Sequence, residues 1–283
     1  MVAVKKIAVM LALTLIAPLT SQSGPESEQL RASLFSQSVA EALNRNFPDR
    51  DISFLLFDAR TGEVLASRWE GAETPIPLGS LTKPFAALAF GQQHDYRYPS
   101  HMCRGVETGC WRPGGHGDVD LTSAIAYSCN SYFRMLTSDL TGADAADTAS
   151  HFGLDVPDRE TSGAELVGLG ARWKISPVRM ARAYLELVRE RQRPGVGQIL
   201  DGMAQSARSG TGAEVDRALQ NSTALVKTGT AACTHARRAP GDGFAVALVP
   251  ADDPRLLLMV RVHGVPGSRA ARTAGEMLRK IGD

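Results

Sequence analysis

The chain has 283 residues, of which 43% are hydrophobic and 22% are charged. Its 31 basic and 30 acidic residues leave a formal net charge of +1, so no bulk electrostatic attraction favours nucleic acid or an anionic membrane as a partner. The length suffices for one large core or for two fused subdomains.

The N-terminal segment has the pattern of a secretory signal peptide. Two adjacent lysines supply a short positive region, residues 7–19 are almost wholly apolar, and small residues follow. Because the apolar run is too short to span a bilayer comfortably, we expect residues 1–23 to be a signal peptide. An uncleaved N-terminal anchor is the alternative. In both cases residues 24–283 cross the inner membrane and belong to the periplasm or the cell envelope.

The pattern of apolar residues predicts five helices and five strands in the exported part. Apolar positions at helical spacing predict helices at 27–46, 81–93, 121–140, 176–192 and 269–281. Apolar runs between turn residues predict strands at 52–57, 63–66, 224–226, 244–249 and 256–262. The Gly/Pro-rich segment 100–117 has no periodicity and is expected to be a loop.

The order of these elements indicates the fold class. Two strands precede the helical middle of the chain and three follow it, which predicts an α+β fold with a mainly antiparallel five-stranded sheet. The N- and C-terminal helices are expected to flank this sheet as an α/β sandwich. The helices at roughly residues 86–220 are expected to form an all-helical subdomain inserted between the strands. Residues 24–283 contain no linker long enough to separate independent domains.

Three short motifs that carry chemistry occur once each. Ser80-Leu-Thr-Lys83 is S-x-x-K, Ser128-Cys-Asn130 is S-x-N, and Lys227-Thr-Gly229 is K-T-G. Each motif is weak by itself, because a serine three residues before a lysine is common on helix surfaces. Their occurrence in this order, each in a suitable predicted element, indicates a serine nucleophile.

The first motif is predicted to place a nucleophile and a base at the start of a helix. Ser80 follows a turn, and Lys83 lies one helical turn later on the same face. A serine hydroxyl is a poor nucleophile until a neighbouring base takes its proton, and a lysine can do so only when it is neutral. A second buried cation such as Lys227 is expected to lower the pKa of Lys83 in that direction.

The third motif is expected on an edge strand beside Ser80. Gly229 would allow a substrate backbone to approach closely there. The backbone amides of Ser80 and Thr230 are placed to form an oxyanion hole. Lys227 and Thr228 are predicted to hold a substrate carboxylate.

These residues resemble the three signatures of the penicillin-binding protein and serine β-lactamase superfamily. The likeness covers roughly residues 50–265, and several longer segments are similar to transpeptidase domains, including those of the class B, cell-elongation type. These segments are 58–66, 78–85, 115–133 and 169–181. Class B proteins carry a large N-terminal pedestal, whereas residues 24–51 are all that lie here between the predicted signal peptide and the first predicted strand.

The resemblance implies a β-lactamase/transpeptidase-like fold and a role for each motif residue. Ser80 attacks the carbonyl of a D-Ala-D-Ala peptidoglycan stem peptide and becomes acylated, with Lys83 as its base. Ser128 passes a proton toward the leaving group, and Asn130 positions the substrate amide. An amine acceptor then completes cross-linking, or water completes a D,D-carboxypeptidase reaction. β-Lactams are the implied inhibitors, and cell-wall synthesis proteins are the implied partners.

Two alternatives stand beside a transpeptidase. A class A β-lactamase needs a carboxylate that activates the deacylating water, and Glu165 is the only glutamate in a suitable position but lacks the following Leu-Asn of E-x-x-L-N. Class D enzymes have S-x-V, which Asn130 contradicts. An alternative of another class is a β-lactam or peptidoglycan sensor that acylates without turnover. A Ser-His-Asp hydrolase is not indicated, because G-x-S-x-G is absent.

Three of the four cysteines lie close to a histidine in the sequence, as Cys103, Cys110, His116 and Cys129. Three thiolates and one imidazole make a closed tetrahedral set for structural zinc, without a position for a catalytic water. Catalysis itself is expected to need no cofactor. The resemblance also points to zinc, because some elongation-type class B relatives carry the metal where His116 and Cys129 lie here. A Cys103–Cys110 disulfide is the alternative in an oxidising compartment. The fourth thiol, Cys233, is expected to be a small buried residue beside the third motif.

Overall fold

The computed structural model describes residues 25–220, 222–233 and 240–282. The predicted signal peptide, residues 1–23, lies outside them. Among the described residues no helix has the length and apolar character needed to cross a membrane. The chain divides into two compact units between Phe35 and Ser36. Helix α1 (Pro25–Asn46) belongs to both, and every other element belongs to the second unit.

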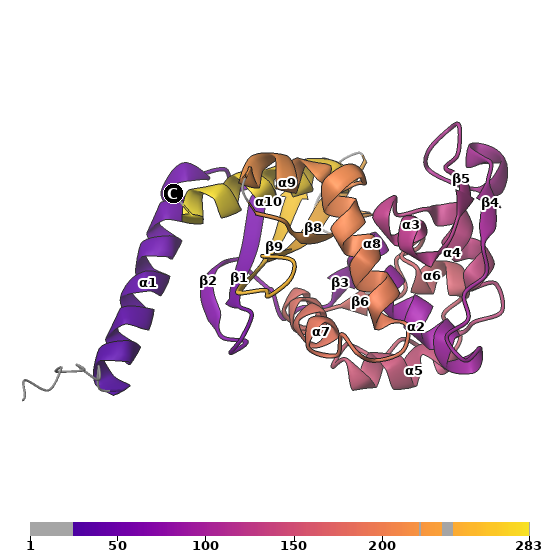
Figure 1. Cartoon of the computed structure of the whole chain (residues 1–283), viewed down its shortest axis with the longest axis horizontal. Coiled ribbons are helices and arrows are strands. Elements are labelled where there is room, and N and C mark those ends of the chain that lie inside the picture. Colours follow the sequence, from indigo (N-terminus) through magenta and orange to yellow (C-terminus); the bar gives the residue numbers. More distant parts are fainter. Residues whose placement is uncertain (1–24, 221, 234–239, 283) are drawn as a thin grey trace, which may run out of the picture. The chain divides into compact units, whose positions relative to one another are not determined.

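A five-stranded antiparallel sheet forms the centre of the second unit, as Figure 1 shows. Its strand order is β2-β1-β9-β8-β7, and every pairing is antiparallel, which confirms the predicted sheet. The strands are β1 (Ile52–Asp58), β2 (Val64–Arg68), β7 (Leu225–Ala231), β8 (Asp242–Val249) and β9 (Leu256–His263). The order places the N-terminal hairpin beside the C-terminal strands. It leaves β7, which carries the third motif, at one edge.

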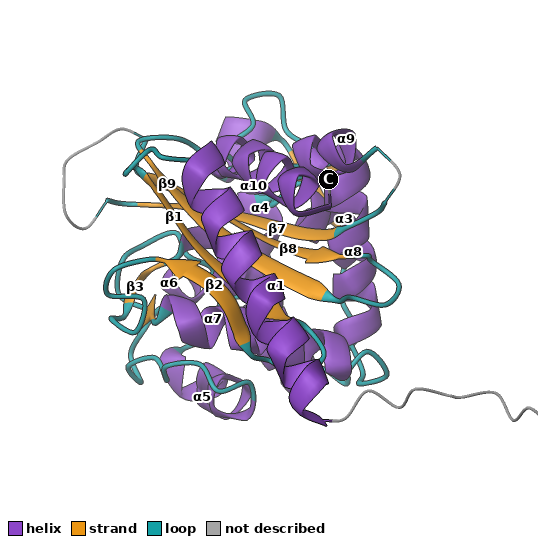
Figure 2. Cartoon of the chain, turned by 90° about the vertical axis from the view of Figure 1, so that its left-hand side faces the viewer, coloured by secondary structure: helices purple, strands orange, loops and turns teal. Residues whose placement is uncertain are grey.

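The sheet has a hydrophobic core on each face, because successive side chains of a strand point to opposite faces. In β1, Phe54 and Leu56 join one core, whereas Leu55 and Phe57 join the other. Helix α10 (Gly267–Gly282) covers the first core, and helices from the middle of the chain cover the second (Figure 2). Full burial of such a side chain contributes about 1.5–3 kcal/mol. The two cores therefore fix the faces of the sheet between their helices.

The remaining helices come from the middle of the chain and pack against the sheet or beside it. They are α2 (Lys83–Gln93), α3 (Leu121–Ala126), α4 (Asn130–Leu136), α5 (Gly142–His151), α6 (Gly163–Leu166), α7 (Pro177–Arg189), α8 (Val196–Ser209) and α9 (Ala213–Leu219). Two 3-10 helices accompany them, η1 (Gly79–Thr82) and η2 (Gly105–Thr108). Two small sheets pair β3 (Ile76–Pro77) with β6 (Lys174–Ile175) and β4 (His101–Cys103) with β5 (Gly117–Val119).

Two predictions of local structure were wrong. The single helix expected over 121–140 is interrupted, because Ser128 adopts a left-handed φ of +51° between α3 and α4. The loop expected over 100–117 contains η2 and the paired strands β4 and β5, which are too short to give a periodic pattern. Both departures lie next to the motif residues and the cysteines, so they shape the site described below.

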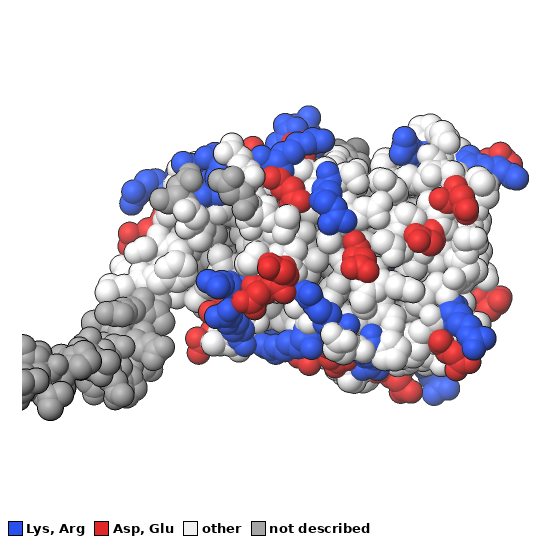
Figure 3. All heavy atoms as spheres, in the orientation of Figure 1, with Lys and Arg blue, Asp and Glu red and all other residues white. Residues whose placement is uncertain are grey.

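The charged side chains are interspersed on the surface. On the face drawn in Figure 3, basic and acidic residues alternate over the second unit, and neither sign forms a continuous patch there. Ion pairs also form between charged side chains of the described residues, as between Arg60 and Asp253 and between Arg193 and Glu190. Basic and acidic side chains are therefore locally mixed on this face.

Candidate active site

The three motifs meet at one pocket of about 310 Å³. Ser80 lies half-buried in η1, the turn of 3-10 helix that leads into α2. The pocket is lined by residues of all three motifs: Ser80, Ser128, Asn130, Thr228, Gly229 and Thr230. Lys83 and Lys227 lie fully buried beneath it and contact the lining residue Ser128. The structure thus brings together all eight residues that the motifs and their resemblance single out.

Two glycines allow η1 and β7 to touch through their backbones. Gly79 has a φ of +56°, and a Cβ atom there would lie 2.2 Å from the carbonyl oxygen of Thr230. A Cβ atom at Gly229 would lie 2.5 Å from the carbonyl oxygen of Leu78. Any larger residue would push the two segments apart. This contact sets the serine of the first motif directly beside the strand of the third.

Both buried lysines point to the second motif. Lys83 Nζ donates hydrogen bonds to the Ser128 carbonyl oxygen at 2.8 Å and to Asn130 Oδ1 at 2.7 Å, and it lies 3.3 Å from Ser128 Oγ. Lys227 Nζ donates to Ser128 Oγ at 3.0 Å and to the Thr228 carbonyl oxygen at 2.7 Å. The Ser128 hydroxyl therefore bridges two amines.

The amine of Lys83 contacts the second motif rather than the Ser80 hydroxyl that its sequence spacing suggested. The helix changes from the 3-10 to the α form between Ser80 and Lys83, so the two side chains do not follow regular α-helical spacing. Tyr184 of α7 stabilises this turn, because its buried hydroxyl donates a hydrogen bond to the Leu81 carbonyl oxygen at 2.8 Å. Ser80 is left facing the pocket while Lys83 reaches Ser128 beneath it.

Burial lowers the pKa of both lysines. Desolvation is the largest cause for Lys83; the thiols of Cys129 and Cys110 oppose it, Arg134 adds to it, and the pKa falls to about 7. The pKa of Lys227 lies well below its ordinary value, first through burial and then through repulsion by Lys83. The sequence-based expectation named Lys227 as the cause of the shift at Lys83. Burial is the larger cause, and the repulsion between the two amines depresses the pKa of Lys227.

Two residues outside the motifs also shape the pocket. Trp111 Nε1 donates to the Ser128 carbonyl oxygen at 3.2 Å, so this carbonyl accepts from both Trp111 and Lys83. Thr211 accepts a hydrogen bond from Thr228 Oγ1 at 2.6 Å. Both side chains line the pocket. Sequence reasoning missed them, because each lies in a turn or loop without periodicity and outside any signature.

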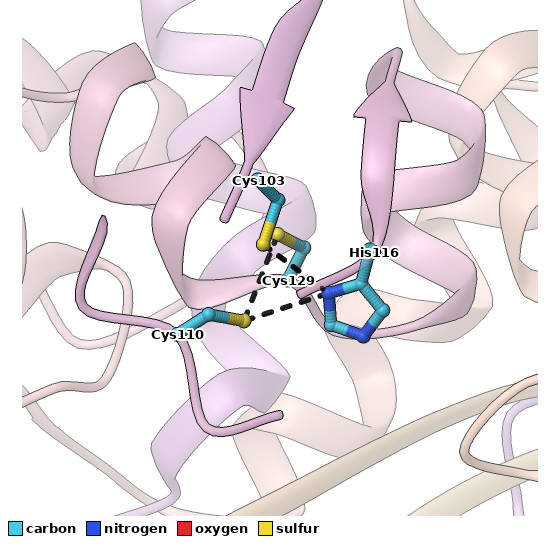
Figure 4. Close-up of side chains that lie close together, drawn as sticks. All are labelled: Cys103, Cys110, His116 and Cys129. Carbon is cyan, nitrogen blue, oxygen red and sulfur yellow. Dashed lines mark hydrogen bonds between the residues drawn. The ribbon is translucent and has the colours of Figure 1, made fainter. Parts of the chain in front are cut away.

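The predicted metal ligands also converge, as Figure 4 shows for Cys103, Cys110, His116 and Cys129. The sulfurs of Cys103 and Cys110 lie 3.6 Å and 3.5 Å from His116 Nδ1, and the sulfurs of Cys110 and Cys129 lie 3.8 Å apart. Cys103 and Cys110 are both thiols in this structure and form no disulfide with each other.

The cluster connects the small β4–β5 sheet to the second motif. Cys103 is the last residue of β4 and pairs with Gly117 of β5, which directly follows His116. Cys129 is the N-cap of α4, and its sulfur accepts from the backbone amide of Tyr132 at 3.5 Å. Burial, with Arg112 and Lys83 nearby, lowers the pKa of His116 to about 4. The four side chains thus join the loop between β4 and β5 to the start of the helix that carries Asn130.

Comparison with known proteins gives one family. The model of the penicillin binding protein transpeptidase domain matches residues 52–283. A search of curated proteins finds no match.

Three solved structures illustrate the likeness of fold. Pseudomonas aeruginosa PBP2 in complex with WCK 5153 is 18% identical with a TM-score of 0.70, over 88% of this chain and 73% of that one. Helicobacter pylori PBP2 in complex with MreC is 17% identical with a TM-score of 0.74, over 87% of this chain and 62% of that one. The D,D-transpeptidase domain of an Eggerthella lenta peptidoglycan glycosyltransferase is 16% identical with a TM-score of 0.67, over 86% of this chain and 80% of that one.

Proposed function

This chain belongs to the penicillin-binding protein transpeptidase family, and we propose that it is a serine D,D-transpeptidase that acts on peptidoglycan stem peptides through an acyl-enzyme at Ser80. One observation carries the proposal. Ser80 and Ser128 line one pocket, and the hydroxyl of Ser128 joins two fully buried lysines, Lys83 and Lys227. A surface serine near a lysine would have no such arrangement.

The buried amines provide the proton transfers that acylation requires. With a pKa of about 7, Lys83 is neutral in a large fraction of molecules at neutral pH and can act as a base. Ser80 Oγ does not contact Lys83 Nζ in this structure, so the step requires the two groups to meet in the substrate complex, where the Ser80 proton passes to Lys83 as Ser80 Oγ attacks the scissile carbonyl carbon. Ser128 Oγ, which contacts both lysines, then supplies a proton to the leaving amine and is reprotonated from a lysine. The C–N bond of the peptide breaks, and an ester to Ser80 forms.

The rest of the pocket is suited to the charges of such a substrate. The backbone of Thr230 lies beside Gly79, so the amides of Ser80 and Thr230 can share the oxyanion that develops at the carbonyl. Lys227 and Thr228 can hold the C-terminal carboxylate of the stem peptide.

A β-lactamase is less well supported by the environment of Glu165. Its carboxylate accepts hydrogen bonds from the Ser162 amide at 3.0 Å and the Ser162 hydroxyl at 2.9 Å, in a capping box at the start of α6. Both hydrogen bonds favour the ionised carboxylate, and they lower the pKa of Glu165. Glu165 does not line the pocket. A D,D-carboxypeptidase and an acylating sensor would form the same acyl-enzyme and are alternatives that differ only in the fate of its ester.

We therefore predict that a β-lactam acyl-enzyme at Ser80 persists for minutes or longer, because Glu165 is engaged in the helix cap. Intact-protein mass spectrometry after a pulse of penicillin would measure this lifetime. In the same experiment, a D-Ala-D-Ala stem peptide with and without an amine acceptor would separate transpeptidation from hydrolysis. Nitrocefin turnover at ~10 per second or faster would favour the β-lactamase instead. Stable acylation without any peptide turnover would favour the sensor.

We propose the periplasm or cell envelope as the location, since the sequence begins with a signal-like segment and the substrate lies outside the inner membrane. Two of the structural neighbours were solved with WCK 5153 and with MreC. We propose β-lactams as inhibitors of this chain because it belongs to the penicillin-binding protein transpeptidase family. The complex of a neighbour with MreC supports protein partners, and we propose cell-wall synthesis proteins as the partners of this chain.

We also propose that Cys103, Cys110, His116 and Cys129 hold a structural zinc ion. Two sulfurs at ~2.3 Å from a tetrahedral metal lie ~3.8 Å apart, and a sulfur and a histidine nitrogen lie ~3.5 Å apart. The observed separations of 3.8 Å, 3.6 Å and 3.5 Å fit these values. The metal would fix the loop at the N-terminus of α4, so it would act on catalysis only through geometry.

The zinc proposal predicts a metal-dependent fold of this loop. Natively purified protein should contain zinc, and Cys110→Ser should lose one metal ion per chain and melt at a lower temperature. Metal analysis by plasma mass spectrometry and a thermal melt would measure the two effects. Ser209→Ala, which removes an exposed hydroxyl on α8, is a control expected to change neither. Unchanged metal content in a folded Cys110→Ser variant would contradict this site.

A further inference from the structure

A second group of metal-ligating side chains lies at one end of the five-stranded sheet, where β7 and β9 end and β8 begins. Cys233 follows β7, Asp242 is the first residue of β8, and His263 is the last residue of β9. Asp242 and His263 are direct register partners, and Ala231 pairs with Asp242 from the other side. Residues far apart in the sequence are therefore placed together by the sheet itself.

The three side chains present a thiol, a carboxylate and an imidazole toward one another. Asp242 Oδ1 lies 2.7 Å from Cys233 Sγ and 2.7 Å from His263 Nδ1, and Cys233 Sγ lies 3.8 Å from His263 Nδ1. The carboxylate of Asp242 is 2% exposed and the imidazole of His263 is 9% exposed. Cys233 is half-buried rather than buried as predicted, so the group has an entry from solvent.

We propose that Cys233, Asp242 and His263 form a second metal site, for zinc or a similar divalent transition metal. Sulfur, nitrogen and a carboxylate oxygen are the three ligand types of zinc, and these three described side chains would fill three of its four tetrahedral positions. Cys233 binds as the thiolate, releasing its proton to solvent, and His263 binds through Nδ1 with its proton on Nε2. The separations of the carboxylate oxygen from the other two donors must each lengthen by ~0.6–0.8 Å, because ~3.3–3.5 Å separates such donors in a tetrahedral site.

The charges around the group are compatible with one divalent ion. The thiolate and the carboxylate carry two negative charges against the 2+ of the metal. Among the described residues Arg261 is a cation near the group, and Asp242 and Cys233 act on it electrostatically. Its guanidinium is turned toward Ser53 and the ring of Trp69, with Nη2 donating to Ser53 Oγ at 2.8 Å. The arginine thus lies behind the group and does not occupy its ligand position.

The position of this site gives it a structural consequence for the pocket. Cys233 lies three residues after Thr230, and His263 lies three residues before Pro266. Thr230, Pro266 and Gly267 all line the pocket, and the Gly267 amide donates to Thr230 Oγ1 at 2.9 Å. A metal at this point would tie the end of the third-motif strand to the adjacent Pro266–Gly267 segment of the pocket wall.

Metal counting in variants of the full chain tests the proposal independently of the first zinc site. Protein purified without chelator should hold about two zinc ions, and Cys233→Ser and His263→Gln should each hold about one. Cys110→Ser should also hold about one, and Cys110→Ser with Cys233→Ser should hold none. If wild type holds one ion that Cys110→Ser removes, the second site is wrong. If it holds one that His263→Gln removes, the first site is wrong and the second stands.

Cobalt provides a second readout that reports the ligands. After chelation and dialysis, Co²⁺ added to the Cys110→Ser chain should give the charge-transfer absorption of one thiolate, and Cys233→Ser in that background should abolish it. A thermal melt of each variant shows that the chain is folded when its metal is counted. Absence of the absorption in a folded Cys110→Ser chain would overturn the proposal, as would undiminished metal in Cys233→Ser.

Discussion

Replacing Ser80 with alanine should abolish covalent labelling by fluorescent penicillin and reduce acylation by three orders of magnitude or more, on the scale of losses seen for enzyme nucleophiles, roughly 10³- to 10⁶-fold. The physical reason is that the Ser80 hydroxyl lines the pocket at the start of α2, whereas the Ser128 hydroxyl is held by both buried amines, so Ser80 supplies the oxygen that is acylated. Gel fluorescence and peptide mapping of the labelled chain would measure the loss and locate the adduct.

The same substitution should leave the fold intact, which makes the result interpretable. Within the described residues the Ser80 hydroxyl makes no hydrogen bond, so its removal should change the free energy of unfolding by no more than about 0.5 kcal/mol. Ser209→Ala is the matched control, because it removes a serine hydroxyl of α8 that bonds only within its own helix. Labelling that survives in a folded Ser80→Ala chain, or an adduct on another residue, would refute the acyl-enzyme proposal.

The sheet could be predicted from the sequence because its strands are continuous apolar runs between clear turns. Residues 244–249 and 256–262 match the interiors of β8 and β9, and their alternate side chains fill the two cores. The helical middle was harder to predict. The break at Ser128 has no signal in the apolar pattern, because a left-handed residue between α3 and α4 is fixed by its contacts with Lys83 and Trp111.

The residues of the site could be predicted, whereas their contacts could not. The motifs marked Ser80, Lys83 and Lys227, but the orientation of each amine depends on the change from 3-10 to α-helix and on the neighbouring strand. The second metal-ligating group could not be found from spacing at all. Asp242 and His263 are separated by a whole hairpin, and only the register of β8 with β9 makes them neighbours.

Acylation by this chain should rise with pH through about 7 and depend on Lys83. The neutral amine is the base, and burial lowers the pKa of Lys83 from its ordinary 10.5 to about 7. Below that value each unit of pH should reduce the acylation rate about tenfold, and above it the rate should reach a plateau. Lys83→Met keeps a buried stem but removes the amine, so acylation should fall roughly 10²- to 10⁴-fold. Stopped-flow or quench-flow acylation between pH 5 and 9 would measure both effects.

The Lys227→Met variant distinguishes the role of Lys83 as the base from the role of Lys227, the other buried amine. Burial is the largest cause of the shift at Lys83, and Lys227 is not among its causes, so the midpoint near pH 7 should persist in Lys227→Met. The variant should instead bind carboxylate-bearing substrates more weakly, which appears as a higher KM with less change in kcat. If Lys83→Met retains the pH dependence and Lys227→Met loses it, the two amines have exchanged roles. Ser128, which contacts both, would then relay the Ser80 proton to Lys227.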